Sequence, residues 1–256
     1  MHLDVVRHRT SGRDLAFFQS NFHHNIFHGM LYAVWHSLRL RRCQHDDHRD
    51  HRQRARRQQP GPAIAHGYDV VLSNSQGPDS LAGLVKELGP RARAASPAQA
   101  AAAGEFAIVA IPLTTIDQVP VEPLAGKVVI ATINYFPQRF GHIPEIDDGT
   151  TTAPGLLQAH LPASRVVRAF SMINAAEMSG DGHPEGDPKR RALALAGDDR
   201  AAKQLVAGLY EEFGFDSVDI GGLDKSWLIE AGQPTFVVRQ DVAELKANLA
   251  RAKRPA

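Results

Sequence analysis

The stretch that decides the fold is residues Gly67–Leu81, which read GYDVVLSNSQGPDSL. Within it, Asp69–Leu72 is a short run rich in β-branched residues after a glycine, which is typical of a buried parallel strand. Three small polar residues and a Gly-Pro turn follow, and a helical pattern then runs from Ser80 to Leu88. A strand that ends in a polar turn and continues into a helix predicts an α/β fold.

The polar end of this strand indicates which ligand such a fold would hold. In dinucleotide-binding folds the second strand ends beside the adenosine ribose. A carboxylate there binds the 2′-hydroxyl of NAD, whereas hydroxyl and cationic groups make room for the 2′-phosphate of NADP. This strand has no carboxylate at its end before Asp79. We therefore predict NADP as the cofactor, bound here by Ser73, Asn74, Ser75 and Gln76.

The same residues carry a family resemblance. GYDVVLSNSQGPDSL resembles the second strand and following turn of the NADPH-dependent reductases of the deazaflavin coenzyme F-420, which are related to the N-terminal domains of pyrroline-5-carboxylate reductases. The resemblance extends from about Ala63 to Pro234 and implies a Rossmann-type fold with a deazaflavin as hydride partner. The family usually has Arg where this chain has Gln76. Because Gln can bind a phosphate but cannot pair its charge, this position favours NADP less strongly than an arginine would.

The first 62 residues differ in composition from the rest. They hold 11 Arg, no Lys and five acidic residues, whereas the remainder holds 18 basic and 23 acidic residues. The near-zero net charge therefore hides two segments of opposite sign. We expect residues 1–62 to be an atypical segment, disordered or mistranslated. Residues 63–256 are expected to form an NAD(P)-binding Rossmann-like domain with a small C-terminal helical extension, since this length can bury a full core.

Cellular location is predicted from three features of the chain. The single cysteine, Cys43, excludes a disulfide framework, which fits a cytoplasmic protein. No apolar run reaches the roughly 18 residues of a membrane-spanning helix, and the N-terminus lacks the segment order of a signal peptide. We therefore expect a soluble cytoplasmic protein with no membrane partner.

Residues 44–62 read QHDDHRDHRQRARRQQPGP and are almost wholly polar. A basic arm of this kind could bind nucleic acid, although Arg without any Lys is unusual for such an arm. His45, His48 and His51 could be offered as metal ligands, but their spacing alone is weak support for a metal site. Charge runs are usually solvated and disordered, so we predict neither a nucleic-acid partner nor a metal.

A shifted reading frame accounts for more of this segment. The resemblance begins at about Ala63, halfway along the first helix of a Rossmann unit, without the first strand and glycine loop upstream. With permitted codons, residues 45–62 read one base later give MTTIGIIGSGRVGSNLA, a strand followed by G-x-G-x-x-G. Arg52, Arg54 and Arg57 each place G first in the shifted codon, and they have the spacing of the three glycines. We therefore expect a frameshift to have removed the first strand, with no well-packed strand in its place.

Apolar runs alternate with helical patterns along the rest of the chain, which predicts a Rossmann-type, doubly wound, mostly parallel sheet. The predicted strands are Ala92–Ala94, Glu105–Pro112, Gly126–Tyr135, Arg165–Ile173, Arg191–Asp198 and Phe215–Ile220. The predicted helices are Pro97–Ala103, Pro154–Leu161, Arg200–Phe213 and Val242–Ala252, the second of them capped by Thr side chains of residues 150–152.

Two further turns are predicted to join the cofactor site, because ligands of such sheets lie beyond the carboxyl ends of the strands. The first holds Pro112 and Leu113, and Pro112 could equally serve only to end its strand. The second is Asn-Tyr-Phe-Pro, with Asn134, Tyr135 and Pro137 as its candidate residues. The resemblance places a similar turn of the family beside the nicotinamide and ribose.

The leading hypothesis is an NADPH-dependent oxidoreductase that transfers hydride between NADP(H) and a deazaflavin or similar small-molecule acceptor. Such chemistry belongs to the cofactors, and we predict no catalytic acid, base, nucleophile or metal. The alternatives are a non-enzymatic dinucleotide-binding redox sensor, an inactive frameshifted relative of the reductase, and a basic-arm nucleic-acid binder. The acceptor and the oligomeric state, for which a homodimer with Trp227 at its interface is one option, do not follow from the sequence.

Overall fold

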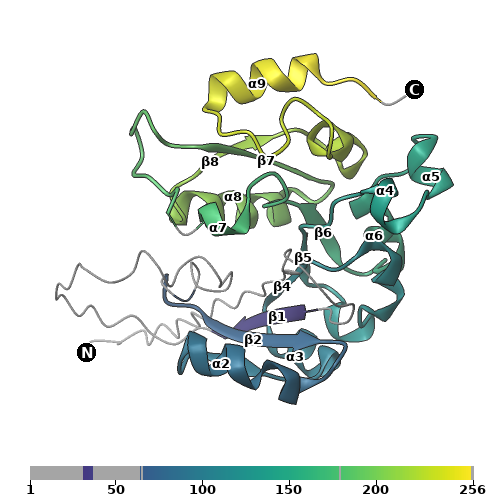
Figure 1. Cartoon of the computed structure of the whole chain (residues 1–256), viewed down its shortest axis with the longest axis vertical. Coiled ribbons are helices and arrows are strands. Elements are labelled where there is room, and N and C mark those ends of the chain that lie inside the picture. The colour runs from purple at the N-terminus through teal and green to yellow at the C-terminus, as the bar shows by residue number, and fades with distance from the viewer. Residues whose placement is uncertain (1–30, 37–63, 65, 179, 255–256) are drawn as a thin grey trace, which may run out of the picture.

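The computed structural model describes residues 31–36, 64, 66–178 and 180–254 (Figure 1). Its strands form one sheet in the order β3-β2-β1-β4-β5-β6-β7-β8. Neighbours β2–β3, β4–β5, β5–β6 and β7–β8 are parallel, whereas β1 is antiparallel to both its neighbours and β7 is antiparallel to β6. The predicted mostly parallel α/β sheet is thereby confirmed. The strands are β1 (Leu31–His36), β2 (Asp69–Asn74), β3 (Ala92–Ala94), β4 (Phe106–Val109), β5 (Val128–Ala131), β6 (Arg165–Arg168), β7 (Ala192–Gly197) and β8 (Asp216–Asp219).

Helices cover both faces of the sheet. In Figure 1 the two long helices α8 and α9 lie on opposite sides of the β7–β8 pair, while α2 and α3 lie along the β1–β2 end. The α-helices are α2 (Ala82–Leu88), α3 (Pro97–Ala103), α4 (Pro137–Phe140), α5 (Pro144–Asp147), α6 (Ala153–His160), α7 (Ala175–Met178), α8 (Arg200–Glu212) and α9 (Val242–Arg251). Short 3₁₀ helices are η2 (Pro78–Leu81), η3 (Leu113–Gln118), η4 (Glu122–Leu124) and η5 (Leu223–Ile229).

The strand and helix boundaries follow from local chemistry. Strands β4 and β5 are apolar throughout, and Val129, Ile130 and Ala131 of β5 are completely buried, as a parallel strand covered on both faces requires. Ser96 begins α3 with a capping box, and the Thr152 hydroxyl accepts from Gly155 N at the start of α6, which confirms the predicted threonine cap. Strand β6 ends at Arg168, earlier than predicted, because Phe170 adopts φ 54° and cannot continue an extended chain.

The expectation that residues 1–62 leave the first-strand position without a strand is wrong. Leu31–His36 (LYAVWH) occupies the place between β2 and β4, although it runs antiparallel to both. An empty position would leave the facing N–H and C=O groups of β2 and β4 unpaired inside the sheet. A segment rich in aromatic and β-branched residues is well suited to pair with both.

The remaining predictions for the N-terminal 62 residues lie outside the described part of the chain. These include the disordered charge run, the basic arm, His45, His48 and His51, and the glycine loop of the shifted frame. Among the described residues, no helix has the length and apolar character needed to cross a membrane.

We predict that Ala33→Pro destabilises the protein because Ala33 pairs with Leu72 on one side and Ile108 on the other. Proline removes the backbone N–H and leaves a buried carbonyl without a donor, at a cost of about 1–3 kcal/mol. Ala33→Gly keeps the N–H and should cost no more than about 1 kcal/mol. Urea unfolding measures both. Equal stability of the proline and glycine variants would show that β1 is not a central strand.

Candidate functional site

The parallel strands place several turns at one edge of the sheet. Strands β4, β5 and β6 are parallel, and β2 is parallel to β4 because both pair antiparallel with β1. The carboxyl ends of these four strands therefore meet at the same edge, where doubly wound sheets bind ligands. Strand β1 contributes its amino end there, since Leu31 pairs with Asn74, whereas its carboxyl end at His36 pairs with Asp69 at the opposite edge.

The polar side chains of the turn after β2 differ in burial. Asn74 is nearly buried, and its Oδ1 accepts from Gln76 N at 3.0 Å while its Nδ2 donates to Ser80 Oγ at 2.8 Å. This Asx turn reverses the chain, and Gly77 completes it with φ 90°, a conformation that favours glycine. The Ser73 hydroxyl is buried without a hydrogen-bond partner in the described part of the chain. Ser75 and Gln76 are exposed and face solvent at the edge.

The turn after β4 offers less to a ligand. Pro112 is half-buried, and its carbonyl accepts hydrogen bonds from Thr115 N at 3.0 Å and Thr115 Oγ1 at 2.7 Å. Leu113 begins η3 and is buried in the hydrophobic core. Pro112 is therefore at the surface of the edge, while Leu113 supports it from within.

The turn after β5 is held by an ion pair that the sequence analysis missed. Arg168 donates through Nη1 to Ile133 O and through Nη2 to Asn134 Oδ1 at 2.7 Å. Glu230 lies 3.3 Å from Arg168 Nη1 and accepts from Tyr135 N at 3.2 Å. Asn134 Nδ2 also donates to Ser171 O at 3.2 Å, so it links this turn to the chain after β6.

Burial shifts both partners of this pair toward their neutral forms. The Arg168 side chain has no exposed surface and that of Glu230 is 15% exposed. Desolvation lowers the pKa of Arg168 and raises the pKa of Glu230, and in each case the charge of the partner opposes the shift. The sequence signal was an Arg inside the apolar run RVVRAF, because a buried arginine requires a carboxylate or carbonyl partner. Nothing local pointed to Glu230 as that partner.

The Tyr135 hydroxyl points away from the ion pair into a second small network. It donates to Asp147 Oδ1 at 2.7 Å and accepts from Ile143 N at 2.9 Å, while His142 Nδ1 lies 2.9 Å from Asp147 Oδ2. Burial raises the pKa of Tyr135, and the hydrogen bond from Tyr135 lowers the pKa of Asp147. These contacts hold the loop that contains Pro137, the first residue of α4, against the turn.

The structure thus brings most predicted site residues to one edge without showing a metal centre. No group of three His, Cys, Asp or Glu residues within the described ranges could hold a metal ion. A hollow of about 440 Å³ lies elsewhere, lined among others by His66, His183, Arg190 and Phe213, and contains none of the predicted site residues.

Comparison with known proteins shows that part of this chain resembles a family. Residues 61–135 match the family described as NADP oxidoreductase, coenzyme F420-dependent. Over these residues, the chain is similar to that family. The matched range contains all predicted site residues except Pro137, and it confirms the predicted class of oxidoreductase. The F420-dependent NADP oxidoreductase match ends before Arg168 and Glu230, which lie in the later part of the chain.

Individual proteins resemble parts of this chain. The Escherichia coli (strain K12) protein YjhV is 34% identical over 71 residues, which are 28% of this chain and 52% of YjhV, so the match spans about half of that relative. A hypothetical protein from Sinorhizobium meliloti has a similar structure, with a TM-score of 0.56 and 27% identity over 66% of this chain and 82% of its own. A candidate F420-dependent NADP-reductase from Arthrobacter sp. FB24 shares the fold, with a TM-score of 0.56 and 24% identity over 68% and 81% of the two chains.

We predict that Arg168→Met destabilises the protein by about 3–5 kcal/mol, because it leaves Glu230 buried without its counter-charge. The double variant Arg168→Met/Glu230→Gln should recover part of this loss, since no isolated charge then remains. Arg165→Met, at the exposed start of the same strand, is the matched control and should change stability by less than about 1 kcal/mol. A double variant less stable than either single variant would contradict this account of the pair.

Proposed function

We propose that the protein is an NADPH-dependent oxidoreductase that transfers a hydride between NADP(H) and a deazaflavin of the F-420 type, or a similar flat acceptor. The observation that carries the proposal is the carboxylate-free polar end of β2, in a chain whose residues 61–135 match this family. The family match supports the reaction class, and the residues of the edge support the choice of cofactor.

The 2′-phosphate of NADP would bind at Ser75 and Gln76. Both side chains are exposed at the end of β2, and the Asx turn of Asn74 fixes their backbone. The first carboxylate beyond the strand, Asp79, belongs to η2 and is not at the strand end. A carboxylate at the strand end is the feature that would favour the free 2′-hydroxyl of NAD, and this chain lacks it. In this proposal Ser73 supports the turn from inside the sheet.

The nicotinamide would lie against the turns after β4 and β5. The nicotinamide supplies the hydride chemistry when bound. Asn134 and the Tyr135 backbone offer a polar surface whose position is fixed by Arg168 and Glu230, and Pro112 offers an apolar contact. These residues orient the ligand and exclude water, and the proposal assigns no proton to any of them. Hydride transfer to an added deazaflavin distinguishes this proposal from a redox sensor that only binds the dinucleotide.

Gln76→Arg is predicted to increase the preference for NADPH over NADH, because an arginine pairs with the phosphate charge that Gln76 can only hydrogen-bond. We expect an increase of about 10-fold in the ratio of the two dissociation constants, which corresponds to about 1.4 kcal/mol. Ser73→Ala is the control, and its ratio should not change because the hydroxyl is buried. Fluorescence titration with both cofactors measures the ratio. If NADPH and NADH bind equally well and Gln76→Arg does not change their ratio, the 2′-phosphate does not bind at this position.

The direction of β1 bears on how well this chain can bind the dinucleotide. A Rossmann unit holds the pyrophosphate on a glycine turn at the carboxyl end of a parallel first strand, against the N-terminus of the next helix. Here the carboxyl end of β1 lies at the edge opposite Ser75 and Gln76. The carboxyl end of β1 is therefore not at the edge where that glycine turn is required.

We predict that the chain with this sequence binds NADPH weakly, while a protein that begins MTTIGIIGSGRVGSNLA and continues from about Ala63 binds it tightly. The second protein would place a parallel strand and a glycine turn at the ligand edge. Both proteins are expressed and titrated with NADPH by fluorescence, and the genomic DNA across codons 40–66 is read in parallel. If the two proteins bind equally well, the frameshift hypothesis is wrong and residues 1–62 contribute to binding.

A further inference from the structure

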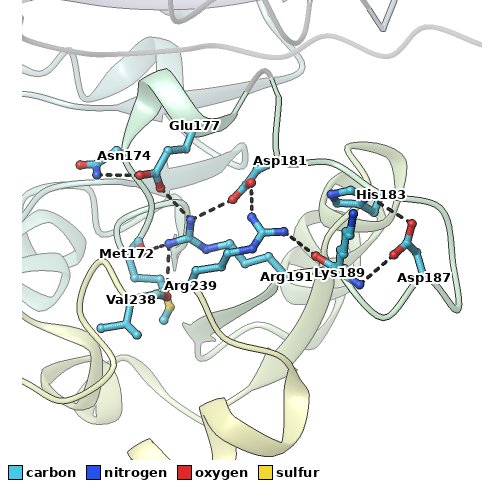
Figure 2. A network of polar contacts seen from close by, with 10 residues as sticks. All are labelled: Met172, Asn174, Glu177, Asp181, His183, Asp187, Lys189, Arg191, Val238 and Arg239. Atoms are coloured by element: carbon cyan, nitrogen blue, oxygen red, sulfur yellow. Dashed lines mark hydrogen bonds and ion pairs between the residues drawn. The ribbon is translucent and has the colours of Figure 1, made fainter.

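A second buried arginine ties together three segments that are distant in sequence. Arg191 directly precedes β7, and its side chain is 1% exposed. Figure 2 shows its guanidinium between Glu177 of α7 and Asp181, at 2.8 and 3.1 Å, with further bonds from Nη2 to the carbonyls of Met172 at 3.2 Å and Val238 at 3.3 Å. Arg239 also bonds Asp181 and donates to Lys189 O at 2.6 Å.

The two carbonyls that Arg191 binds both follow strained backbone. Among the described residues, Phe170 and Val237 are the non-glycine residues with positive φ, each at 54°. Met172 lies two residues after Phe170, and Val238 directly follows Val237. A left-handed conformation is costly for bulky and β-branched residues, and it persists only where the surroundings fix it.

The turn after β6 is fixed at three consecutive residues. The Phe170 N–H donates a hydrogen bond to Tyr210 Oη at 2.8 Å. Ser171 O accepts from Asn134 Nδ2 at 3.2 Å, and Met172 O accepts from Arg191. The Ser171 contact connects this turn to the proposed nicotinamide surface.

We propose that Arg191 is a positioning residue that clamps the turns Phe170–Met172 and Val237–Val238. By holding the first turn, it fixes the Ser171 carbonyl that binds the Asn134 side chain at the ligand edge. The part of this inference that concerns the ligand rests on the proposed function, whereas the clamp itself does not. Breaking the clamp releases both strained turns, and Asn134 then loses a fixed partner on the β6 side. Two carboxylates and two carbonyls compensate the buried guanidinium, so this site holds its arginine in one orientation.

The neighbouring Arg190 provides a matched control. Its side chain is 3% exposed and also bonds two carboxylates, Glu211 at 2.7 Å and Asp216 at 2.8 Å. It also donates to the carbonyls of His183 at 2.9 Å and Phe215 at 3.0 Å. Arg190 has nearly the same burial and bonding as Arg191, but none of these four partners belongs to either strained turn.

The test is hydrogen–deuterium exchange of the full chain carrying Arg191→Met, Arg191→Lys or Arg190→Met. In Arg191→Met we expect exchange to rise at least about 10-fold in peptides spanning 170–174 and 235–240, relative to peptides of β2 and β3. Arg191→Lys should give a smaller rise in the same peptides, because lysine keeps the charge without the fork of donors, and it serves if the methionine variant does not fold. Arg190→Met should raise exchange near 211–216 instead. Equal rises over the whole sheet in both Arg191 variants would overturn the clamp.

NADPH titration of the same proteins tests the ligand part. We expect Arg191→Met to raise the dissociation constant at least about 10-fold and Arg190→Met less than about 2-fold, after correction for the folded fraction. Equal losses of affinity in the two variants would overturn the positioning role. If the unsubstituted chain binds no NADPH, the proposed function fails for this chain, and the exchange pattern still decides whether Arg191 clamps the two turns.

Discussion

The geometry of the candidate site depends on the buried guanidinium of Arg168. Three consecutive residues after β5 are attached to one ion pair: Arg168 binds the Ile133 carbonyl and the Asn134 side chain, and Glu230 binds the Tyr135 amide. A buried ion pair need not add net stability, because the desolvation of both charges opposes their attraction. Its directional bonds do fix an orientation, and here they orient the turn that faces the proposed nicotinamide position.

A similar arrangement recurs one strand further along the sheet. Arg191 binds main-chain carbonyls on two turns, as Arg168 does on one, and both arginines are compensated by carboxylates from other segments. Between them lies the turn after β6, which contacts Asn134 on one side and Arg191 on the other. The wall of the edge between β5 and β7 is therefore held by polar bonds of defined direction, whereas the strands behind it are held by apolar packing.

Sequence patterns predicted those parts of the fold that depend on local chemistry. The bounds of β3 and α3 were predicted correctly, and those of α3 follow from local signals, a Ser-Pro helix start and an alanine-rich run. The polar end of β2 was predicted for the same reason. Arg168 and Glu230 were not, because their pairing depends on a long-range contact that leaves no local pattern. The early end of β6 was also missed, since a phenylalanine gives no indication that its φ will be positive.

The strand β1 shows why a correct fold prediction does not settle the function. Sheet formation requires only that the N–H and C=O groups of β2 and β4 find partners, and an antiparallel strand satisfies them as well as a parallel one. Dinucleotide binding requires more, because the pyrophosphate site lies at the end of a strand with a defined direction and needs a glycine turn and a helix N-terminus there. Reversing one central strand therefore preserves the sheet, the core and the positions of Ser75, Gln76 and Asn134, but it places the carboxyl end of that strand at the other edge. In the proposed function the turns after β2, β4 and β5 bind the two ends of NADP, and the pyrophosphate between them must be held by a segment other than the end of β1.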